Sequence, residues 1–466
     1  MEKKQRSKFA SNFGFLMACV GGAVGLGNVW GFPGKLGRGG GFWFLLIYVA
    51  VVFLMGISLT LTEYALGRKT RKGPVAGYME LCKKYTWVGV LNTLVCTGVM
   101  CFYWLLMGWI LRYTVGFFVS IFNPSCAFWT TESSSFFGTF ISSPVESMIY
   151  TFICVAIGYI ILRKDAAGGI ESICKWMIPA LFALLVIVAV RGMTLPGAVE
   201  GLKYMFQPNG ENFKAAGGFF AVAALAVGQM FFSVNVGFGT NFLYGSYMPD
   251  ESNMSRSAVM VPIADTIVAL TAGLATIPAA FAFGFSPSTG AGMLFVTMKA
   301  VFATLPGGAI FGFIFFVAVF FAGISSAVGV TAAIMAVPEE NWNWSHKKAT
   351  ILSHVIPAVV AIVACLGYSV LSDVRILGWL PESLPAHNYD ILDSIDYICE
   401  MVLATVAALG LVIYAGWVHK PKNIIAEVER NGVKMGWKKF YTVCIKFVCP
   451  VIVAFCVLTS IGILQF

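Results

Sequence analysis

Long apolar stretches, separated by short polar connections, dominate the pattern of hydrophobic and polar positions along the chain. A window of ~19 residues, about the length of a membrane-spanning helix, finds eleven such stretches. They cover residues 11–36, 41–67, 87–121, 142–162, 169–190, 213–246, 256–284, 307–338, 348–370, 390–418 and 438–464. None shows the alternating polarity of a membrane β-strand. The pattern therefore predicts an all-α membrane protein with eleven transmembrane helices in one domain, residues 1–466.

Composition and charge narrow the class of protein. Hydrophobic residues make up 58% of the 466 residues and charged residues 11%, which excludes soluble enzymes, nucleic-acid binders and disordered scaffolds. Lysine and arginine gather near the N-terminus and in residues 68–84 and 420–439. Because cytoplasmic loops carry the excess of positive charge, we expect a cytoplasmic N-terminus and attribute the net charge of +9 to topology. No cleavage site of small residues follows the N-terminus, so no removable signal peptide is predicted.

Two of the stretches are interrupted in the middle by glycine and polar residues. Residues 21–28 read GGAVGLGN, and residues 233–241 read SVNVGFGTN. Each glycine costs up to ~1 kcal/mol relative to alanine inside a helix, so both segments are predicted to unwind. For the first segment taken alone, glycine as a helix-packing surface is the alternative.

The two interruptions fall in equivalent places if the first ten helices form two inverted halves, residues 11–190 and 213–418, followed by an eleventh helix at 438–464. Such paired interruptions are typical of secondary transporters. The N-terminal ends of half-helices attract an anion such as a carboxylate, and bare carbonyls attract a cation. The pattern therefore predicts a binding site for a zwitterion and a metal ion.

Five short motifs connect the chain with a known family. They are GAVGLGNVWGFP at 22–33, EYALGR at 63–68, GQMFFS at 228–233, GFG at 237–239 and FAGISS at 321–326. With them the chain resembles the bacterial branch of the neurotransmitter:sodium symporter family, which includes bacterial leucine and tyrosine transporters. The resemblance implies the five-plus-five inverted-repeat leucine-transporter fold with broken helices one and six. It also implies a transporter of the bacterial inner membrane, and no enzyme.

The resemblance further implies two bound Na+ ions. Position by position, the first sodium site would consist of Ala23, Asn28, Ser233 and Asp265. The second sodium site would consist of Gly21, Val24, Ala322, Ser325 and Ser326. All of them offer the hard oxygen ligands that such a cation needs. A serine in a membrane helix often bonds back to its own helix, which is the alternative for Ser325 and Ser326. The register of Asp265 is defined only to within one residue.

The substrate would lie between the broken helices. Its contacts would be Ala23, Leu26, Gly27, Val99, Tyr103, Phe232, Ser233, Asn235, Phe238, Ser326 and Val330. By the same resemblance, the monoamine transporters of the family have an aspartate at the position of Gly25. This chain has no carboxylate there to bind a lone amine, so an amino acid is the expected substrate. Mostly apolar walls favour a neutral, hydrophobic or aromatic side chain, although Asn235 could bond to a polar one.

The gates follow from the same resemblance. The outer gate would consist of Tyr103, Phe232 and Asp396, and the inner gate of Arg6, Phe9, Tyr247 and Glu340, with Glu339 as an equally close acid. Gly31 replaces the arginine that pairs with the outer acid in relatives, and Lys35 or Arg38 could serve in its place. Glu63, deep in the second stretch, is expected to bond to the unwound backbone of helix six.

These inferences predict a sodium-coupled symporter that imports neutral amino acids by alternating access. Asp265 would supply the negative charge that chloride provides in the family's animal members, so uptake should be chloride-independent. Two alternatives stay open: a proton-coupled amino acid transporter on the same fold, and an amino acid sensor that does not transport. The expected partners are the amino acid and membrane lipid, with no nucleic acid, and the oligomeric state is open.

Overall fold

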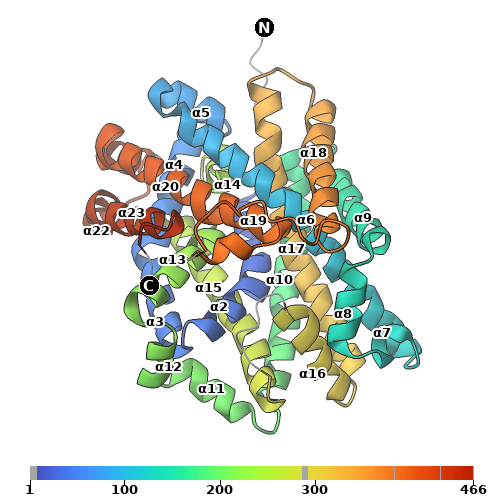
Figure 1. Ribbon diagram of the computed structural model, residues 1–466. Helices are drawn as coiled ribbons and strands as arrows, with labels where there is room; N and C mark the ends of the chain where they lie inside the picture. The colour runs from blue at the N-terminus through green and yellow to red at the C-terminus, as the bar shows by residue number, and fades with distance from the viewer. Residues whose placement is uncertain (1–7, 286–291, 383, 431, 465–466) are drawn as a thin grey trace.

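The computed structural model describes residues 8–285, 292–382, 384–430 and 432–464. Over these residues the chain forms helices and connecting segments, with no β-strand (Figure 1). Nine helices in the described part are long and apolar enough to cross a membrane. They are α3–α4 (Phe42–Thr70), α6 (Thr86–Phe122), α9 (Pro144–Leu162), α10 (Ala166–Met193), α15 (Met254–Ala282), α17 (Gly308–Glu340), α18 (His346–Leu366), α19–η7 (Ile391–Val418) and α22–α23 (Lys438–Ser460).

Several of the long helices contain a short π-helical turn. In the second span, η2 (Val52–Gly56) joins α3 (Phe42–Val51) to α4 (Ile57–Thr70). The last two spans contain α19 (Ile391–Asp396), η6 (Tyr397–Leu403), α20 (Ala404–Ile413), η7 (Tyr414–Val418), α22 (Lys438–Val443), η8 (Cys444–Val448) and α23 (Cys449–Ser460). Such turns often mark functional positions in membrane helices.

Both predicted interruptions are present. The first span consists of α1 (Asn12–Ala23), η1 (Gly27–Gly31) and α2 (Phe32–Arg38), and it bends by 47° at the break. The sixth stretch forms α13 (Gly218–Val234) and α14 (Thr240–Tyr247), which are separated by residues 235–239. With the bent pair, up to ten spans are established in the described residues. The count of eleven stays a prediction, because α13 is shorter than the ~20 residues that a span needs.

Glycine residues allow neighbouring helices to pack closely around the two broken helices. α6 and α17 lie along each other, α1 packs on α10 and α17, and α14 packs on α4. A Cβ added at Gly67 would lie 1.9 Å from the carbonyl oxygen of Phe242, and one at Gly245 would lie 2.4 Å from that of Tyr64. Only glycine therefore lets α4 and α14 approach this closely, as small residues do in membrane helix pairs.

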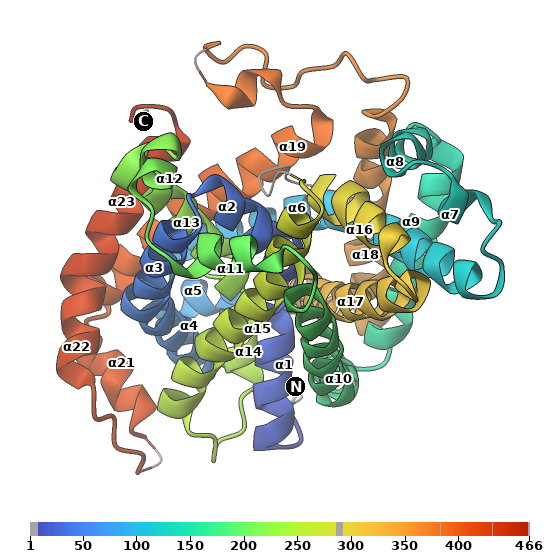
Figure 2. The same ribbon diagram turned by 90° about the horizontal axis from the view of Figure 1, so that it is seen from below.

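Short helices form parts of the connections between the spans. They are α5 (Pro74–Leu81), α7 (Ala127–Thr130), α8 (Ser133–Ile141), α11 (Ala198–Phe206), α12 (Gly210–Ala215), α16 (Met298–Thr304) and α21 (Pro421–Val428). Figure 2 shows α21 and the start of α1 near the lower end of the view, and α12, α19 and the end of α23 near the upper end. The first span therefore begins at the end of the molecule that carries α21.

Candidate functional site

The break between α13 and α14 is supported by buried polar side chains. Asn235, Gly237 and Gly239 all have left-handed backbone angles, with φ of 55°, 82° and 80°. Glu63 on α4 accepts hydrogen bonds from the Gly237 amide at 3.4 Å and from Asn241 Nδ2 at 3.2 Å. The prediction that Glu63 bonds to the unwound backbone is confirmed. Asn241 also donates to the Val234 carbonyl at 2.9 Å, which satisfies the end of α13.

A network of oxygen and amide groups joins the two breaks to α15. Asn28 Nδ2 donates to Ser233 Oγ at 3.0 Å and to Asp265 Oδ1 at 2.7 Å. The Ser233 hydroxyl donates to Asp265 Oδ2 at 2.7 Å, and the Tyr48 hydroxyl reaches the same oxygen at 3.4 Å. Asn28, Ser233 and Asp265 are each 0% exposed. The structure thus brings together the three side chains predicted for the first sodium site.

The Gly22 carbonyl forms a second meeting point, between α1 and its neighbours. Asn235 Nδ2 donates to this oxygen, and so does the Ser326 hydroxyl from α17, at 3.1 Å. On the other side of the break, Gln229 Nε2 donates to the Gly27 carbonyl at 2.7 Å. Carbonyls on both sides of the break in the first span are therefore partly engaged by side chains from α13, from the break that follows it, and from α17.

The space between the breaks is narrow. Tyr103 on α6 lies with its hydroxyl 3.3 Å from the Leu26 amide. A Cβ added at Gly25 would lie 2.9 Å from Ser326 Cβ and 3.0 Å from the Tyr103 hydroxyl. A carboxylate at position 25 would therefore displace both neighbours. This packing agrees with the expectation that position 25 offers no acidic side chain to bind the amine of a substrate.

Aromatic and apolar side chains surround the same region. A Cβ added at Gly27 would lie 2.7 Å from the Phe232 ring, so that ring packs directly on the η1 backbone. The rings of Phe232 and Phe238 lie 6.4 Å apart. Val99 and Val330, predicted as further walls, are buried on α6 and α17. Ala23 ends α1 and is also buried.

The residues predicted for the second sodium site are buried but differently bonded. The Ser325 hydroxyl donates to the Ala322 carbonyl of its own helix at 2.9 Å, which is the alternative considered for this serine. Only its neighbour Ser326 reaches α1 with a hydrogen bond from its side chain. Gly21 and Val24 are buried in and beside α1.

The outer gate lacks the arginine of relatives but has a nearby lysine. Lys35 on α2 holds its Nζ 5.8 Å from the centre of the Phe232 ring. Its ammonium attracts the carboxylates of Asp396 and Glu400, two acids that stand one helical turn apart in the same span. No ion pair within 4 Å involves Lys35 in the described part of the chain. Of the two candidate replacements for arginine, Lys35 is therefore the better placed.

Among the predicted inner-gate residues, Phe9 and Tyr247 contact each other just before the start of α1. The Phe9 ring packs on Tyr244 and Tyr247 at 6.0 and 5.7 Å, and its amide donates to the Tyr247 carbonyl at 3.1 Å. Glu340 accepts from the Gly73 amide at 2.8 Å, whereas Glu339 pairs with His346 at 2.6 Å. Arg6 lies outside the described residues.

Other contacts of this segment involve residues that the sequence did not single out. Glu171 on α10 accepts hydrogen bonds from the Ala10 amide at 2.6 Å and the Ser11 hydroxyl at 3.1 Å. Lys8 and Arg71 both pair with Asp250, and the bond from Lys8 lowers the pKa of that carboxyl. An acid in an apolar stretch was the only available signal for these contacts of Glu171. Its ion pair with Lys175 is local, whereas Ala10 and Ser11 are 160 or more residues away in the chain.

Comparisons with known proteins agree with this geometry. A family model described as the sodium:neurotransmitter symporter family matches residues 6–136 and 120–465. The chain belongs to this family. It is 32% identical over its full length to YhdH, an uncharacterised sodium-dependent transporter of Bacillus subtilis that it also covers completely. It is 29% identical to an uncharacterised sodium-dependent transporter of Haemophilus influenzae, over 97% of each chain.

A solved structure extends the comparison to three dimensions. The crystal structure of MhsT in complex with L-phenylalanine is 30% identical, with a TM-score of 0.88 over 98% of this chain and 100% of that one. The family, the helical transporter fold and the multi-pass membrane character predicted from the sequence are therefore confirmed. The family consists of transporters and not of enzymes, as expected.

Proposed function

We propose that this chain imports neutral, hydrophobic or aromatic amino acids together with sodium, by alternating access and without chloride. The observation that carries the proposal is the network of Asn28, Ser233 and Asp265, where both helix breaks meet. Unwound backbone beside buried oxygen ligands is what a secondary transporter uses to bind a cation and a carboxylate. The likeness to MhsT, whose structure holds L-phenylalanine, supports the substrate class.

In this proposal two Na+ ions bind beside the substrate. The first is held by the Ala23 carbonyl and the side chains of Asn28, Ser233 and Asp265. The second is held by the carbonyls of Gly21, Val24 and Ala322 and by the hydroxyls of Ser325 and Ser326. The substrate carboxylate faces the Leu26 and Gly27 amides and the Tyr103 hydroxyl, close to the first ion. Asn235 contributes little to selection, because its amide already donates to the Gly22 carbonyl.

The proposed gates lie on either side of this site. Tyr103 and Phe232 close over the substrate, and Lys35 faces Asp396 in place of the missing arginine. Phe9, Tyr247 and Glu340, with Arg6, close the path from the end at which α1 begins. We place that end in the cytoplasm of a bacterium, because lysine and arginine gather there. Rocking of the inverted halves, 11–190 and 213–418, would expose the site to each side in turn.

Uptake into liposomes tests the proposal. Purified protein should accumulate labelled L-phenylalanine under an inward Na+ gradient, and replacing external Na+ with choline should abolish uptake. Excess unlabelled neutral amino acids should compete, whereas acidic and basic ones should not. Uptake driven by a proton gradient without Na+ would favour the proton-coupled alternative. Sodium-dependent binding of L-phenylalanine with no accumulation would favour the sensor.

A further inference from the structure

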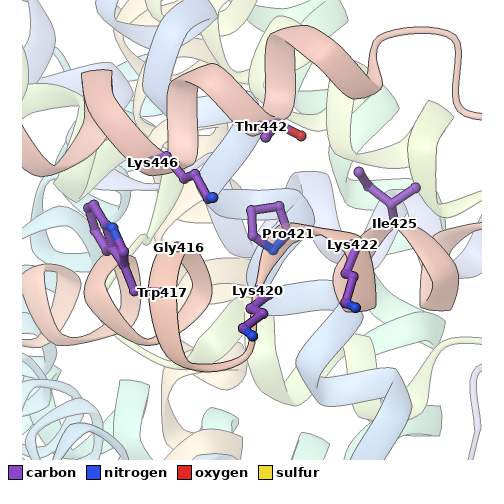
Figure 3. Close-up of a pocket in the computed structure, with 8 residues that line it drawn as sticks. All are labelled: Gly416, Trp417, Lys420, Pro421, Lys422, Ile425, Thr442 and Lys446. Carbon is purple, nitrogen blue, oxygen red and sulfur yellow. The ribbon is translucent and has the colours of Figure 1, made fainter.

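A groove between the last two spans of the described chain, Ile391–Val418 and Lys438–Ser460, is lined by three lysines. Its walls consist of Gly416, Trp417, Lys420, Pro421, Lys422, Ile425, Thr442 and Lys446. Figure 3 shows two sides to it: Thr442 and Lys446 come from one helix, and the other residues come from the facing segment. The Lys446 side chain extends from α22–η8 toward that segment. The groove therefore presents ammonium groups from two separate elements.

The positive charge of the groove is not compensated by nearby acids. No ion pair within 4 Å involves Lys420, Lys422 or Lys446 in the described residues. The acidic residues that follow next in the sequence already form ion pairs with other basic residues. Glu427 pairs with Arg68 at 2.9 Å, and Glu429 pairs with Lys438 at 2.7 Å.

Histidine adds no charge to the groove. Burial, together with the neighbouring charge of Lys69, lowers the pKa of His419 to about 4, so its imidazole is neutral at physiological pH. The three lysines are therefore the charge that a ligand would meet, and the ligand must be an anion.

The backbone on one side of the groove is held in an unusual conformation. Lys420 has a φ of 70°, a left-handed angle that non-glycine residues rarely adopt. Pro421 follows as the first residue of α21, so the N-terminal end of that helix opens at the groove. A helix N-terminus with lysines around it favours a negatively charged group such as phosphate. An outlier of this kind is a reason to look for a function.

The groove also has features that are typical of the membrane–water interface. Lys446 belongs to an apolar span, where a lysine extends its ammonium toward the headgroups. Trp417 is 48% exposed, and tryptophan is enriched at the membrane–water boundary. Val443, Phe447 and Val451 are exposed at four-residue spacing beside Thr442 and Lys446, and they form an outward apolar stripe. The stripe leads from the lysines toward the interior of the bilayer.

We propose that this groove binds the headgroup of an anionic phospholipid. The phosphate lies among Lys420, Lys422 and Lys446 at the start of α21, and an acyl chain follows the stripe of Val443, Phe447 and Val451. Basic grooves between membrane helices on the positively charged side suit such lipids. The apolar stripe distinguishes a lipid from a soluble phosphate, because only a lipid uses both features.

Native mass spectrometry of the detergent-purified full chain tests the proposal, with phosphatidylglycerol and phosphatidylcholine as probes. The wild type should bind phosphatidylglycerol at least tenfold more tightly than phosphatidylcholine. The triple variant Lys420→Gln, Lys422→Gln, Lys446→Gln should lose that preference. The matched control Lys164→Gln, Lys347→Gln, Lys348→Gln removes three exposed lysines elsewhere and should stay within twofold of the wild type. Equal binding by the two triple variants would overturn the proposal.

A second measurement uses Trp417 and needs only single changes. In phosphatidylcholine liposomes that contain brominated phosphatidylglycerol, tryptophan fluorescence should be quenched. Trp417→Phe should remove part of the quenching, and Lys446→Gln should reduce it at least twofold. Brominated phosphatidylcholine should show no such difference. If millimolar inorganic phosphate reduced the quenching and Phe447→Ser left lipid binding unchanged, the groove would bind a soluble anion. That result would overturn the lipid assignment. Neither measurement uses an amino acid substrate, so failure of the proposed transport function leaves both results interpretable.

Discussion

The two proposed sodium sites are built in different ways from similar donors. At the first site, a carboxylate, an amide and a hydroxyl from three helices already bond to one another at 2.7 to 3.0 Å. At the second site, the Ser325 hydroxyl is bonded to its own helix, and Ser326 is bonded to the Gly22 carbonyl. The first set of ligands is linked by contacts between helices, whereas Ser325 of the second set is bonded within its own helix.

Because of this difference, we expect the two proposed sodium sites to have different roles in transport. A network that includes a buried negative charge can offset the charge of a cation and keep η1, α13 and α15 together. A site whose hydroxyls have alternative partners within protein can release its ion at low cost, because those hydroxyls stay bonded. We therefore expect the first site to determine the charge balance of transport and the second to respond to movement of α1 relative to α17.

The largest expected effect comes from removing the charge of Asp265. Asp265→Asn keeps the size of the side chain but leaves the cations without their fixed counter-ion, a loss worth several kcal/mol even at an effective dielectric of ~20. Sodium-driven L-phenylalanine uptake in gluconate medium should fall by about 100-fold or more. Chloride should restore part of it if the halide can take the place of the carboxylate.

The control for this experiment is Asp393→Asn, which removes an exposed acid from α19. It should leave both the rate and the ion dependence unchanged. Equal uptake by Asp265→Asn and the wild type in gluconate would show that Asp265 has only a structural role. A loss of thermal stability without a change in ion dependence would support the same conclusion.

The contrast between the sites also shows what sequence reasoning can and cannot reach. The breaks in α1–α2 and α13–α14 were predictable, because glycine and asparagine inside an apolar stretch weaken a helix locally. The pairing of Asn28 with Asp265 depended on the family motifs, since the two residues are 237 positions apart. From the sequence, the bond of Ser325 to its own helix could be stated only as an alternative to sodium binding. The contacts of Glu171 with Ala10 and Ser11, and the charge interaction of Glu400 with Lys35, were missed because they join helices far apart in the chain, which no local pattern identifies.

The second prediction concerns the two hydroxyls of the more adaptable site. Ser325→Ala combined with Ser326→Ala removes both hydroxyls and leaves only carbonyl ligands for the second ion. At about 1 kcal/mol for each hydrogen-bonding group, we expect the half-saturating Na+ concentration for uptake to rise by roughly tenfold or more. Flux measured against Na+ concentration checks this, with Ser353→Ala on α18 as the control. If the double variant has the Na+ dependence of the wild type, the second site is wrongly assigned.

The smallest expected effect concerns Tyr48, at the edge of the first network. Its hydroxyl lies 3.4 Å from Asp265 Oδ2, at the long end of hydrogen-bond distances, whereas Ser233 donates to the same oxygen at 2.7 Å. Tyr48→Phe therefore removes a weak bond and keeps the ring packing on Phe32 and Phe44. A net loss of about 0.5 kcal/mol corresponds to a change of roughly twofold in Na+ affinity. Ser233→Ala, which removes a short bond and a proposed ligand, should weaken Na+ affinity by about tenfold in the same flux assay. If Tyr48→Phe proves as damaging as Ser233→Ala, the tyrosine hydroxyl takes part in binding the ion or the counter-charge directly, and the first site extends further toward α3 than the bond lengths indicate.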